Sequence, residues 1–363
     1  MSSDERRHAL ATLAIHAGTE RFDGALVTPI FQSSTYASTG VTEYHELKYI
    51  RLSTSPNHRV LHARLAALEG GEDALVTASG MAAITTTVLS VLRAGNRLLA
   101  EIGCYGGTDS FFRHELPRLG IEVDFFDAMT DPASWPLQPN TRAIYVESIS
   151  NPLLRVIPLE TVVSFARGHG LVSMVDNTFA TPLEVRPLEL GIDLVLHSAT
   201  KYLNGHSDIV AGAVVGSAQR ILAIRKRLNH LGGSLDPHAC YLLERGLKTL
   251  PLRFRHQSAS AAVVADWLRE RVEVVHYPGI GGVIAFELDD ADAMLARLKL
   301  FLVAPSIGGV ESLAVRPAAS TALEMTPKEM EAAGIHQHLV RLSIGCEDIG
   351  DLLADLAQAW PSR

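Results

Sequence analysis

Lys201 lies among residue types that could together bind a phosphorylated aldehyde. An apolar segment at 193–197 and two hydroxyl residues, Ser198 and Thr200, precede it, and a glycine-containing segment at 204–208 follows. This order predicts a buried strand that delivers the lysine into a tight loop, whereas a lysine taken by itself favours a solvated surface position. A desolvated lysine loses basicity, so its neutral amine can attack a carbonyl carbon. The combination predicts pyridoxal 5'-phosphate (PLP), held on Lys201 as a Schiff base.

Two further candidates lie at the ends of predicted strands. Gly80 and Met81 stand between a strand at 74–78 and a helix, where a glycine lets backbone N–H groups approach a phosphate. Asp176 ends an apolar strand at 171–175, and a carboxylate in such a place needs a partner. Beside a pyridine ring it would keep the ring nitrogen protonated. The structural alternatives are a plain turn for the glycine and an N-cap or turn for the aspartate.

Three other side chains could contact a cofactor or its substrate. Tyr105 precedes two glycines, and its ring could stack on an aromatic cofactor or relay a proton. Asn151 follows a strand at 143–147 and could donate to a ring oxygen. Arg341 alternates with apolar residues at 339–344, so it projects from one strand face and could bind a carboxylate with two nitrogens. A core tyrosine, an ordinary turn and a rim ion pair are the respective alternatives.

The segments that would position these residues alternate between two hydrophobic periods. Strands are predicted at 74–78, 97–100, 121–126, 143–147, 171–175, 194–197 and 209–215, and helices at 61–68, 81–93, 106–119 and 159–168. Strands that alternate with helices indicate an α/β fold with a mostly parallel sheet covered on both faces. In such sheets ligands bind beyond the carboxyl ends of the strands, where the candidate residues fall.

The pattern changes near residue 236. A long helical stretch is predicted at 237–269, then strands at 271–276, 282–288, 312–315 and 339–344, with helices near 290–298 and 347–359. We therefore predict three parts: an N-terminal arm at 1–53 without a core of its own, a PLP-binding large domain at 54–235, and a smaller α/β domain at 236–363.

Composition argues against several classes of function. The net charge of −8 argues against a nucleic-acid partner. No apolar run approaches the roughly 20 residues of a membrane helix, and the N-terminus lacks the apolar core of a secretory signal. Cys104, Cys240 and Cys346 form no C-x-x-C pair, so no metal or redox site is predicted, and the cytoplasm is the expected location. His336 and His338 are interpreted as loop or surface residues.

Nine sequence segments carry a resemblance to a known family: 15–18, 65–71, 78–81, 105–108, 147–152, 175–182, 197–201, 246–249 and 306–312. Together they resemble the cystathionine γ-synthase/cystathionine β-lyase family, the Cys/Met metabolism group of PLP-dependent enzymes, over the stretch from Thr12 to Leu353. The resemblance implies PLP fold type I, which is aspartate-aminotransferase-like, and a homotetramer made of two active dimers.

The resemblance also implies a role for each candidate residue. Lys201 would bind PLP and shuttle protons, Asp176 would hold the pyridine nitrogen, and Tyr105 would stack on the ring. Four residues would bind the phosphate: Gly80, Met81, Ser198 and Thr200. Tyr49 and Arg51 match the family's Y-x-R and would reach the phosphate of a neighbouring subunit's cofactor. The cofactor oxygen and the carboxylate of an amino-acid substrate would be oriented by Asn151, Ser306 and Arg341.

Four features depart from the family pattern. The segment at 52–57 differs from the usual G-N-P-T, and the segment at 277–282 is short, which trims the C-terminal domain. Pro305 stands where many γ-acting members have glutamate and resembles the plant γ-synthases. Gly107 replaces a cysteine associated with methionine γ-lyases.

The resemblance predicts an enzyme of transsulfuration. Pro305 and the stretch at 194–212 favour γ-replacement, in which an O-acylhomoserine is joined to cysteine, as by cystathionine γ-synthase. Cystathionine β-lyase or γ-lyase activity, which cleaves a C–S bond, is the alternative. A non-catalytic protein that binds PLP or an amino acid remains a third possibility, against which the full set of candidates argues. The absence of a G-x-G-x-x-G after a strand argues against a nicotinamide enzyme.

Overall fold

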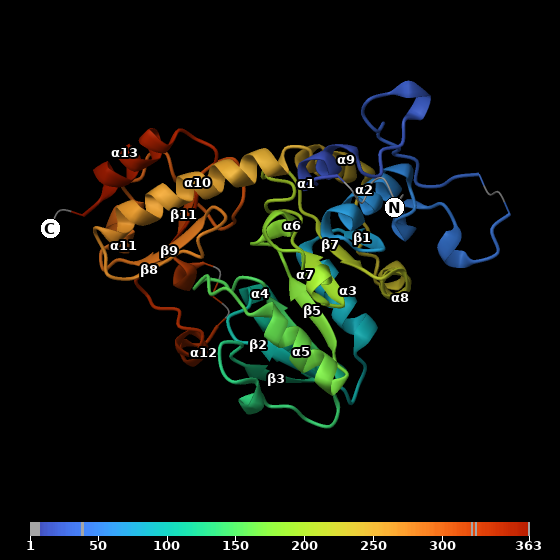
Figure 1. Cartoon of the computed structure of the whole chain (residues 1–363), viewed down its shortest axis with the longest axis horizontal. Helices are drawn as coiled ribbons and strands as arrows, with labels where there is room; N and C mark the ends of the chain where they lie inside the picture. The colour runs from blue at the N-terminus through green and yellow to red at the C-terminus, as the bar shows by residue number, and fades with distance from the viewer. Residues whose placement is uncertain (1–7, 38–39, 321, 324, 362–363) are drawn as a thin grey trace.

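Two β-sheets joined by a long helix make up the protein (Figure 1). The computed structural model describes residues 8–37, 40–320, 322–323 and 325–361. The larger sheet has seven strands and the smaller has five. Helix α10 (Leu250–Arg269) runs from beside the large sheet to the small sheet. No helix in the described ranges is both long and apolar enough to span a bilayer.

The large sheet has the strand order β1-β7-β6-β5-β4-β2-β3. Its strands are β1 (Asp73–Thr77), β2 (Arg97–Glu101), β3 (Glu122–Phe126), β4 (Thr141–Glu147), β5 (Val172–Asp176), β6 (Leu194–His197) and β7 (Gly212–Gly216). Neighbouring strands are parallel except that β7 runs antiparallel to both β1 and β6. The predicted α/β fold with a mostly parallel sheet is confirmed.

Helices cover both faces of this sheet, as the alternation of buried side chains requires. On β4, Ala143 and Tyr145 join one apolar cluster, whereas Ile144 and Val146 join another. The first cluster is completed by α3 (Gly80–Val91), α8 (Ala218–Leu231) and η5 (Phe111–Glu115), which directly follows α4 (Gly106–Ser110). The second is completed by α5 (Leu159–His169) and α7 (Pro187–Leu190). A third cluster packs α2 (Pro56–Glu69) and α9 (Pro237–Leu247) beside β1 and β7.

Serine caps set the starts of the main helices. The hydroxyl of Ser55 accepts from the N–H of His58 at the start of α2, and that of Ser79 accepts from Ala82 at 3.0 Å at the start of α3. At its C-terminus α2 ends on Gly70 with a φ of +76°, a left-handed conformation that glycine adopts without strain.

The small sheet has the strand order β10-β11-β12-β9-β8. Its strands are β8 (Val275–His276), β9 (Val283–Glu287), β10 (Leu302–Val303), β11 (Leu313–Val315) and β12 (Leu339–Ser343). Only β10 and β11 pair in parallel among these strands. Its apolar face packs on α10, α11 (Ala291–Leu295) and α13 (Ile349–Ala359). The short α12 (Pro327–Ala332) lies closer to the large sheet (Figure 1).

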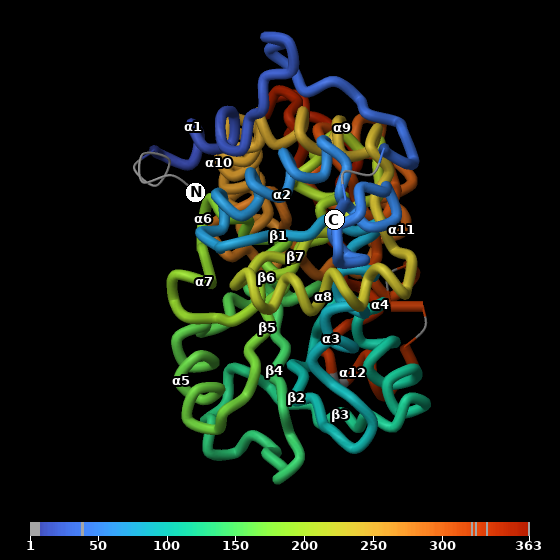
Figure 2. The backbone as a smooth tube through the Cα atoms, turned by 90° about the vertical axis from the view of Figure 1, so that its right-hand side faces the viewer, coloured from blue at the N-terminus to red at the C-terminus, as the bar shows by residue number. Residues whose placement is uncertain are grey.

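The N-terminal segment begins with a helix whose Leu13 and Ala14 are buried in the cluster around α2, and it then extends away from both sheets. It contains α1 (Leu10–His16), η2 (Phe22–Gly24), η3 (Tyr44–Glu46) and η4 (Ile50–Leu52), and an isolated bridge pairs Thr35 with Tyr49. Figure 2 shows it looping outward beyond α1 and α2. Several of its large apolar side chains are exposed: Leu26, Val27, Ile30 and Val41. The division at residues 53 and 235 stays a prediction, although a core-poor arm and two sheets are compatible with it.

Three helical segments differ from the predictions. The stretch predicted as one helix at 106–119 consists of α4, the π-helical η5 and η6 (Pro117–Leu119). The stretch predicted at 237–269 is two helices, α9 and α10, that meet near Thr249. Helix α8 was missed altogether. The remaining short elements are η7 (Pro132–Ser134), α6 (Thr181–Glu184) and η8 (Pro317–Ala319).

Arg253, in the first turn of α10, connects the long helix to the loop that carries Lys201. One terminal nitrogen donates to the backbone carbonyl of Tyr202 at 3.0 Å, and the other to that of Gly246 at 2.9 Å. Arg253 is buried, and the cost of burying its charge lowers the pKa of the guanidinium to about 10. The residue after Lys201 is therefore fixed by a side chain from the helix that supports the small sheet.

Candidate active site

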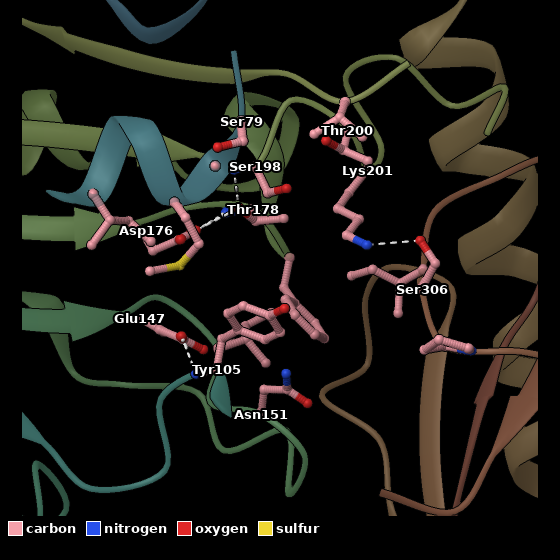
Figure 3. A pocket seen from close by; sticks show the side chains of 18 of the residues that line it. Ser79, Tyr105, Glu147, Asn151, Asp176, Thr178, Ser198, Thr200, Lys201 and Ser306 are labelled. Carbon is pink, nitrogen blue, oxygen red and sulfur yellow. Dashed lines mark hydrogen bonds between the residues drawn. The ribbon is translucent and has the colours of Figure 1, made fainter. Parts of the chain in front are cut away.

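A cavity of about 370 Å³ lies at the carboxyl ends of the large sheet's strands and faces the small sheet (Figure 3). It is lined by nine of the predicted site residues: Gly80, Met81, Tyr105, Asn151, Asp176, Ser198, Thr200, Lys201 and Arg341. Ser306, the tenth, also lines it. Residues that are far apart in the sequence thus meet at the sheet edge where ligands of open α/β folds bind.

Lys201 projects into this cavity from the loop after β6. Its Nζ donates to the hydroxyl of Ser306 at 2.7 Å (Figure 3). Burial, together with the positive charge of Arg341, lowers the pKa of the Lys201 amine to about 8. A lysine with this pKa has a substantial neutral fraction near physiological pH, which is the form that attacks a carbonyl carbon.

Arg341 enters the cavity from β12 of the small sheet. It donates to Oδ1 of Asn151 at 2.9 Å and to the backbone carbonyl of Ser306 at 3.4 Å. Burial lowers the pKa of its guanidinium to about 10, and its Nε is buried without a hydrogen-bond partner. A buried cation with an unused donor is suited to a carboxylate ligand.

Asp176 ends β5 on the opposite side of the cavity. Its Oδ1 accepts from the backbone N–H of Thr178 at 2.9 Å and from the Thr178 hydroxyl at 2.5 Å. Burial raises the pKa of this carboxyl, and the Thr178 hydrogen bonds oppose that rise. A buried carboxyl aimed at a cavity is stabilised as an anion by a cationic partner, such as a protonated ring nitrogen.

Glu147 is a further acid in the cavity floor, and it fixes the position of Tyr105. It ends β4, opposite Asp176 in the register of β4 and β5, and its Oε1 accepts from the backbone N–H of Tyr105 at 2.6 Å. Burial raises the pKa of Glu147 well above its ordinary value, and the charge of Asp176 adds to the rise. The Tyr105 side chain lines the cavity and is 42% exposed, so one part of it is open to a ligand.

Hydroxyl groups and a helix start gather at the end of the cavity near α3. Ser79, Ser198 and Thr200 lie together there (Figure 3). A Cβ atom on Gly80 would lie 2.9 Å from that of Ser198, so only glycine fits between the helix and the Lys201 loop. The first N–H groups of α3 have no partner within the helix and, with the hydroxyls, suit a phosphate.

These features fit PLP as predicted. The lysine, the buried acid, the exposed phenol and the anion-binding end lie around one cavity of suitable size. The unpartnered Nε of Arg341 is an orphan donor on the same wall. Among the residues described, no group of three or more His, Cys, Asp or Glu side chains could hold a metal ion.

Tyr49 and Arg51 do not line this cavity within the chain. Arg51 donates to the backbone carbonyl of Asn229 and to the hydroxyl of Tyr44, both at 2.7 Å. Both residues belong to the N-terminal arm and border a different, smaller hollow. Their predicted contact with a neighbouring subunit's cofactor stays a prediction.

Several site residues were missed from the sequence. Thr178 and Glu147 were within the segments that carried the resemblance, but no role was assigned to them. The signal for Glu147 was present, since it ends a strand as Asp176 does. The pairing of Asn151 with Arg341 joins residues 190 positions apart, and no local pattern indicates it.

Comparisons with known proteins agree with this geometry. The profile of the family described as "Cys/Met metabolism PLP-dependent enzyme" matches residues 11–361. An L-methionine gamma-lyase of Pseudomonas putida is 43% identical, with 99% of each chain covered. A cystathionine beta-lyase of Lactococcus lactis subsp. cremoris is 39% identical, with 98% of this chain and 100% of that protein covered.

A solved structure from Campylobacter jejuni superposes with a TM-score of 0.92 at 31% identity, and covers 97% of this chain and 99% of its own. It is described as a "putative O-acetylhomoserine (thiol)-lyase" and contains N'-pyridoxyl-lysine-5'-monophosphate. The fold is therefore that of PLP-dependent enzymes of fold type I.

Proposed function

This chain belongs to the Cys/Met metabolism PLP-dependent enzyme family, and on that premise we propose that it cleaves the C–S bond of a sulfur-containing amino acid. PLP is its cofactor. The curated relatives of highest identity reported above are a methionine γ-lyase and a cystathionine β-lyase, which supports a lyase. The position of Lys201 in a cavity between Asp176 and Arg341 is the observation that carries the proposal. Because the family consists of enzymes, the non-catalytic alternative is no longer supported.

The groups around the cavity would hold PLP. Its phosphate would lie against Gly80, Met81, Ser198 and Thr200, and its ring between Tyr105 and the carboxylate of Asp176. When bound, PLP supplies an aldehyde for Lys201 and a ring that withdraws electrons from the α-carbon of the substrate. Asp176 strengthens that effect, since an anion beside the ring nitrogen favours its protonated form.

Lys201 and Arg341 would perform the remaining tasks. Arg341 binds the carboxylate of the substrate, with Asn151 holding its guanidinium in place. Lys201 Nζ, once free, removes the proton from the α-carbon and can return it to another carbon or to the departing group. In the chain without PLP the hydroxyl of Ser306 accepts from Lys201 Nζ, so Ser306 would set the position of this amine once it is free. The leaving group departs as a thiol in this scheme.

A second candidate is γ-replacement, in which cysteine displaces the acyl group of an O-acylhomoserine. The sequence favoured this reaction through Pro305, which lines the cavity. The structural similarity to the protein described as an O-acetylhomoserine (thiol)-lyase also supports it. Both reactions begin with removal of the α-proton, so the same residues serve either one.

Three assays with purified holoenzyme test these proposals. Borohydride should bleach the visible colour and add the mass of reduced PLP to Lys201; a label on another lysine would contradict the assignment. Methionine or cystathionine should yield a keto acid and a thiol. If instead only O-acylhomoserine plus cysteine yields a product, the γ-replacement candidate replaces the lyase.

We also propose a cytoplasmic homotetramer of two active dimers. The three free cysteines are compatible with a reducing compartment. The exposed apolar side chains of the arm, including Leu26 and Val27, favour its burial against another copy. Light scattering of the purified protein would measure the mass, and a monomer at micromolar concentration would contradict the proposal.

A further inference from the structure

Glu69 lies at the end of α2, in a place that disfavours a carboxylate. It is the last residue of that helix, and the C-terminal end of a helix carries partial negative charge. The residue is 1% exposed, and its Oε2 is buried without a hydrogen-bond partner. A buried carboxylate in this position lowers stability unless donors reach it. A residue that breaks the local rules in this way is expected to serve a purpose beyond its own helix.

The other oxygen of Glu69 joins two segments of the large sheet. Oε1 accepts from Nε2 of His197 at 2.6 Å and from Nδ2 of Asn177 at 3.0 Å. Because an ionised carboxylate can only accept, Nε2 of His197 carries a proton. All three side chains are buried, and none of the three is among the residues that line the described cavity.

The two segments that meet at Glu69 carry opposite ends of the candidate site. Asn177 directly follows Asp176, the acid assigned to the ring nitrogen, and His197 directly precedes Ser198, which belongs to the phosphate end. One carboxylate oxygen at the end of α2 therefore holds the neighbours of both groups.

A second link joins the same segments on the side of the cavity. The backbone N–H of Ser198 donates to the hydroxyl of Thr178 at 2.8 Å, and that hydroxyl donates to Asp176 (Figure 3). With Glu69 on the other side, the two segments are fixed to each other at two places, as a preorganised site requires.

We propose that Glu69 is a positioning residue that sets the distance between the ring-nitrogen acid and the phosphate end of the site. It acts through Asn177 and His197. PLP contacts both ends at once, so it binds tightly only if their separation matches its length. The inference rests on the placement of PLP proposed above for Asp176 and Ser198, and it does not depend on which bond of the substrate is cleaved.

PLP and pyridoxal, which has no phosphate, together measure how well the two ends match. Pyridoxal can use Lys201 and the ring acid, whereas only PLP also uses the phosphate end. The full chain, freed of PLP, is titrated with each compound, and visible absorbance gives the two Kd values. Glu69→Met removes the acceptor oxygen, so the advantage of PLP over pyridoxal should shrink roughly tenfold, the factor that one hydrogen bond to a charged group contributes. An unchanged advantage would overturn the inference.

Two milder variants test whether the shared oxygen is responsible. Glu69→Gln keeps an oxygen that can accept from both donors, so it should retain most of the advantage of PLP. If it loses as much as Glu69→Met, the shared acceptor does not set the distance and the inference fails. Asn177→Ala removes one donor and leaves the bond from His197, so it should shrink the advantage by less. It also serves if Glu69→Met does not fold, and no shrinkage in Asn177→Ala would contradict the inference.

Glu244 provides a matched control for loss of stability. It is also buried, and its carboxylate pairs with Arg64 of α2 at 3.4 Å and with Lys248 at 3.2 Å. Glu244→Met should lower the free energy of unfolding in urea, as Glu69→Met does, because it leaves a buried charge without its partner. It should not change the ratio of the two Kd values. If both variants narrow the ratio equally, general loosening explains the effect and the inference fails.

The outcome is separable from that of the proposed function. If Glu69→Met narrows the ratio but the unchanged enzyme turns over no sulfur amino acid, the lyase proposal fails and the inference stands. If turnover occurs and the ratio does not change, the reaction class stands and the inference is overturned. Contacts from a second chain through Tyr49 and Arg51 are the same in every variant, so they cancel in the comparison.

Discussion

Lys201 and Arg341 are two cations that line one cavity, and the charge of Arg341 affects the protonation of Lys201. The Lys201 amine has a pKa of about 8, lowered first by burial and then by the charge of Arg341. In the chain freed of PLP, Lys201 can be labelled with a reagent that reacts with neutral amines. The labelling rate should therefore rise with pH and level off above about pH 8.

Replacing the arginine separates the two causes. Arg341→Gln removes a positive charge, so the inflection in the Lys201 labelling rate should move to higher pH. Arg341→Lys keeps the charge and should leave the inflection close to that of the unchanged chain. Mass spectrometry of the labelled peptide, followed over a pH series, gives the rate at Lys201 alone. An inflection that does not move in Arg341→Gln would show that the charge of Arg341 has no influence.

Ser306 combines a functional hydroxyl with a strained backbone. Its φ of +128° lies in a region that residues with a Cβ atom rarely adopt, and its hydroxyl accepts from Lys201. Ser306→Ala and Ser306→Gly both remove the hydroxyl, so both should lower kcat/KM. Only glycine relieves the strain, so the glycine variant should be more stable than the alanine variant by about 1 kcal/mol. Urea unfolding would measure this, and equal midpoints for the two variants would contradict it.

At the scale of elements, three adjacent parallel strands end in carboxylates. Glu101, Glu147 and Asp176 are the last residues of β2, β4 and β5, and all three are buried. The backbone N–H of Glu147 donates to Glu101 at 3.4 Å. This row places several acids side by side at the edge that faces the cavity, where burial raises the pKa of each.

The row predicts a pH dependence of stability. Burial raises the pKa of Glu101 to about 8, so the folded chain holds a proton that the unfolded chain loses near pH 4.5. Between these values the unfolded state binds fewer protons, and stability falls as pH rises. Glu101→Gln should flatten that fall by several kcal/mol between about pH 5 and 8. Unfolding free energies at several pH values would test this, with Glu122→Gln, on the exposed start of β3, as the control.

The helices and strands could be predicted where segments of strand-like and helix-like hydrophobic period follow one another along the sequence. The strands of the large sheet appear within a few residues of their predicted bounds, apart from β7, whose start lies three residues later. The stretch at 237–269 was predicted as one helix although Gly246 and Pro251 interrupt it. Pro251 marks the start of the second helix, because proline cannot donate a helical hydrogen bond and is favoured in a first turn. Helix α8 also had signals, with a Ser217 cap and buried residues at 221, 224 and 228.

At the scale of the whole molecule, the site joins segments that only the tertiary fold brings together. Lys201 and Asp176 could be identified because each follows its own apolar strand. Ser306 was named only through the family resemblance, and its hydrogen bond to Lys201 has no local sequence signal, since the two residues are 105 positions apart. The burial that shifts each pKa is likewise a property of the packed sheets and has no local sequence signal.

The N-terminal arm carries a prediction about assembly. Tyr49 and Arg51 lie outside the cavity of their own chain, and both are predicted to complete a neighbour's site. A variant with Tyr49→Phe and Arg51→Ala should be inactive, as should Lys201→Ala. Mixing the two after mild dissociation should restore up to about a quarter of the activity, because one site in a mixed dimer is intact. Self-mixed variants are the control, and no recovery in mixed dimers would contradict a shared site.

The hydrogen bond from Arg253 to the backbone carbonyl of Tyr202 links the position of the small sheet to that of the Lys201 loop. The amino-acid sequences of the two sheets therefore cannot change independently. Helix α10 packs on the apolar face of the small sheet and also donates a hydrogen bond to the residue that follows Lys201. Repacking that face would therefore reposition the nucleophile even if no side chain near it were altered. The two sheets are therefore not exchangeable modules. If the small sheet were replaced by that of another protein, α10 would have to be replaced together with it.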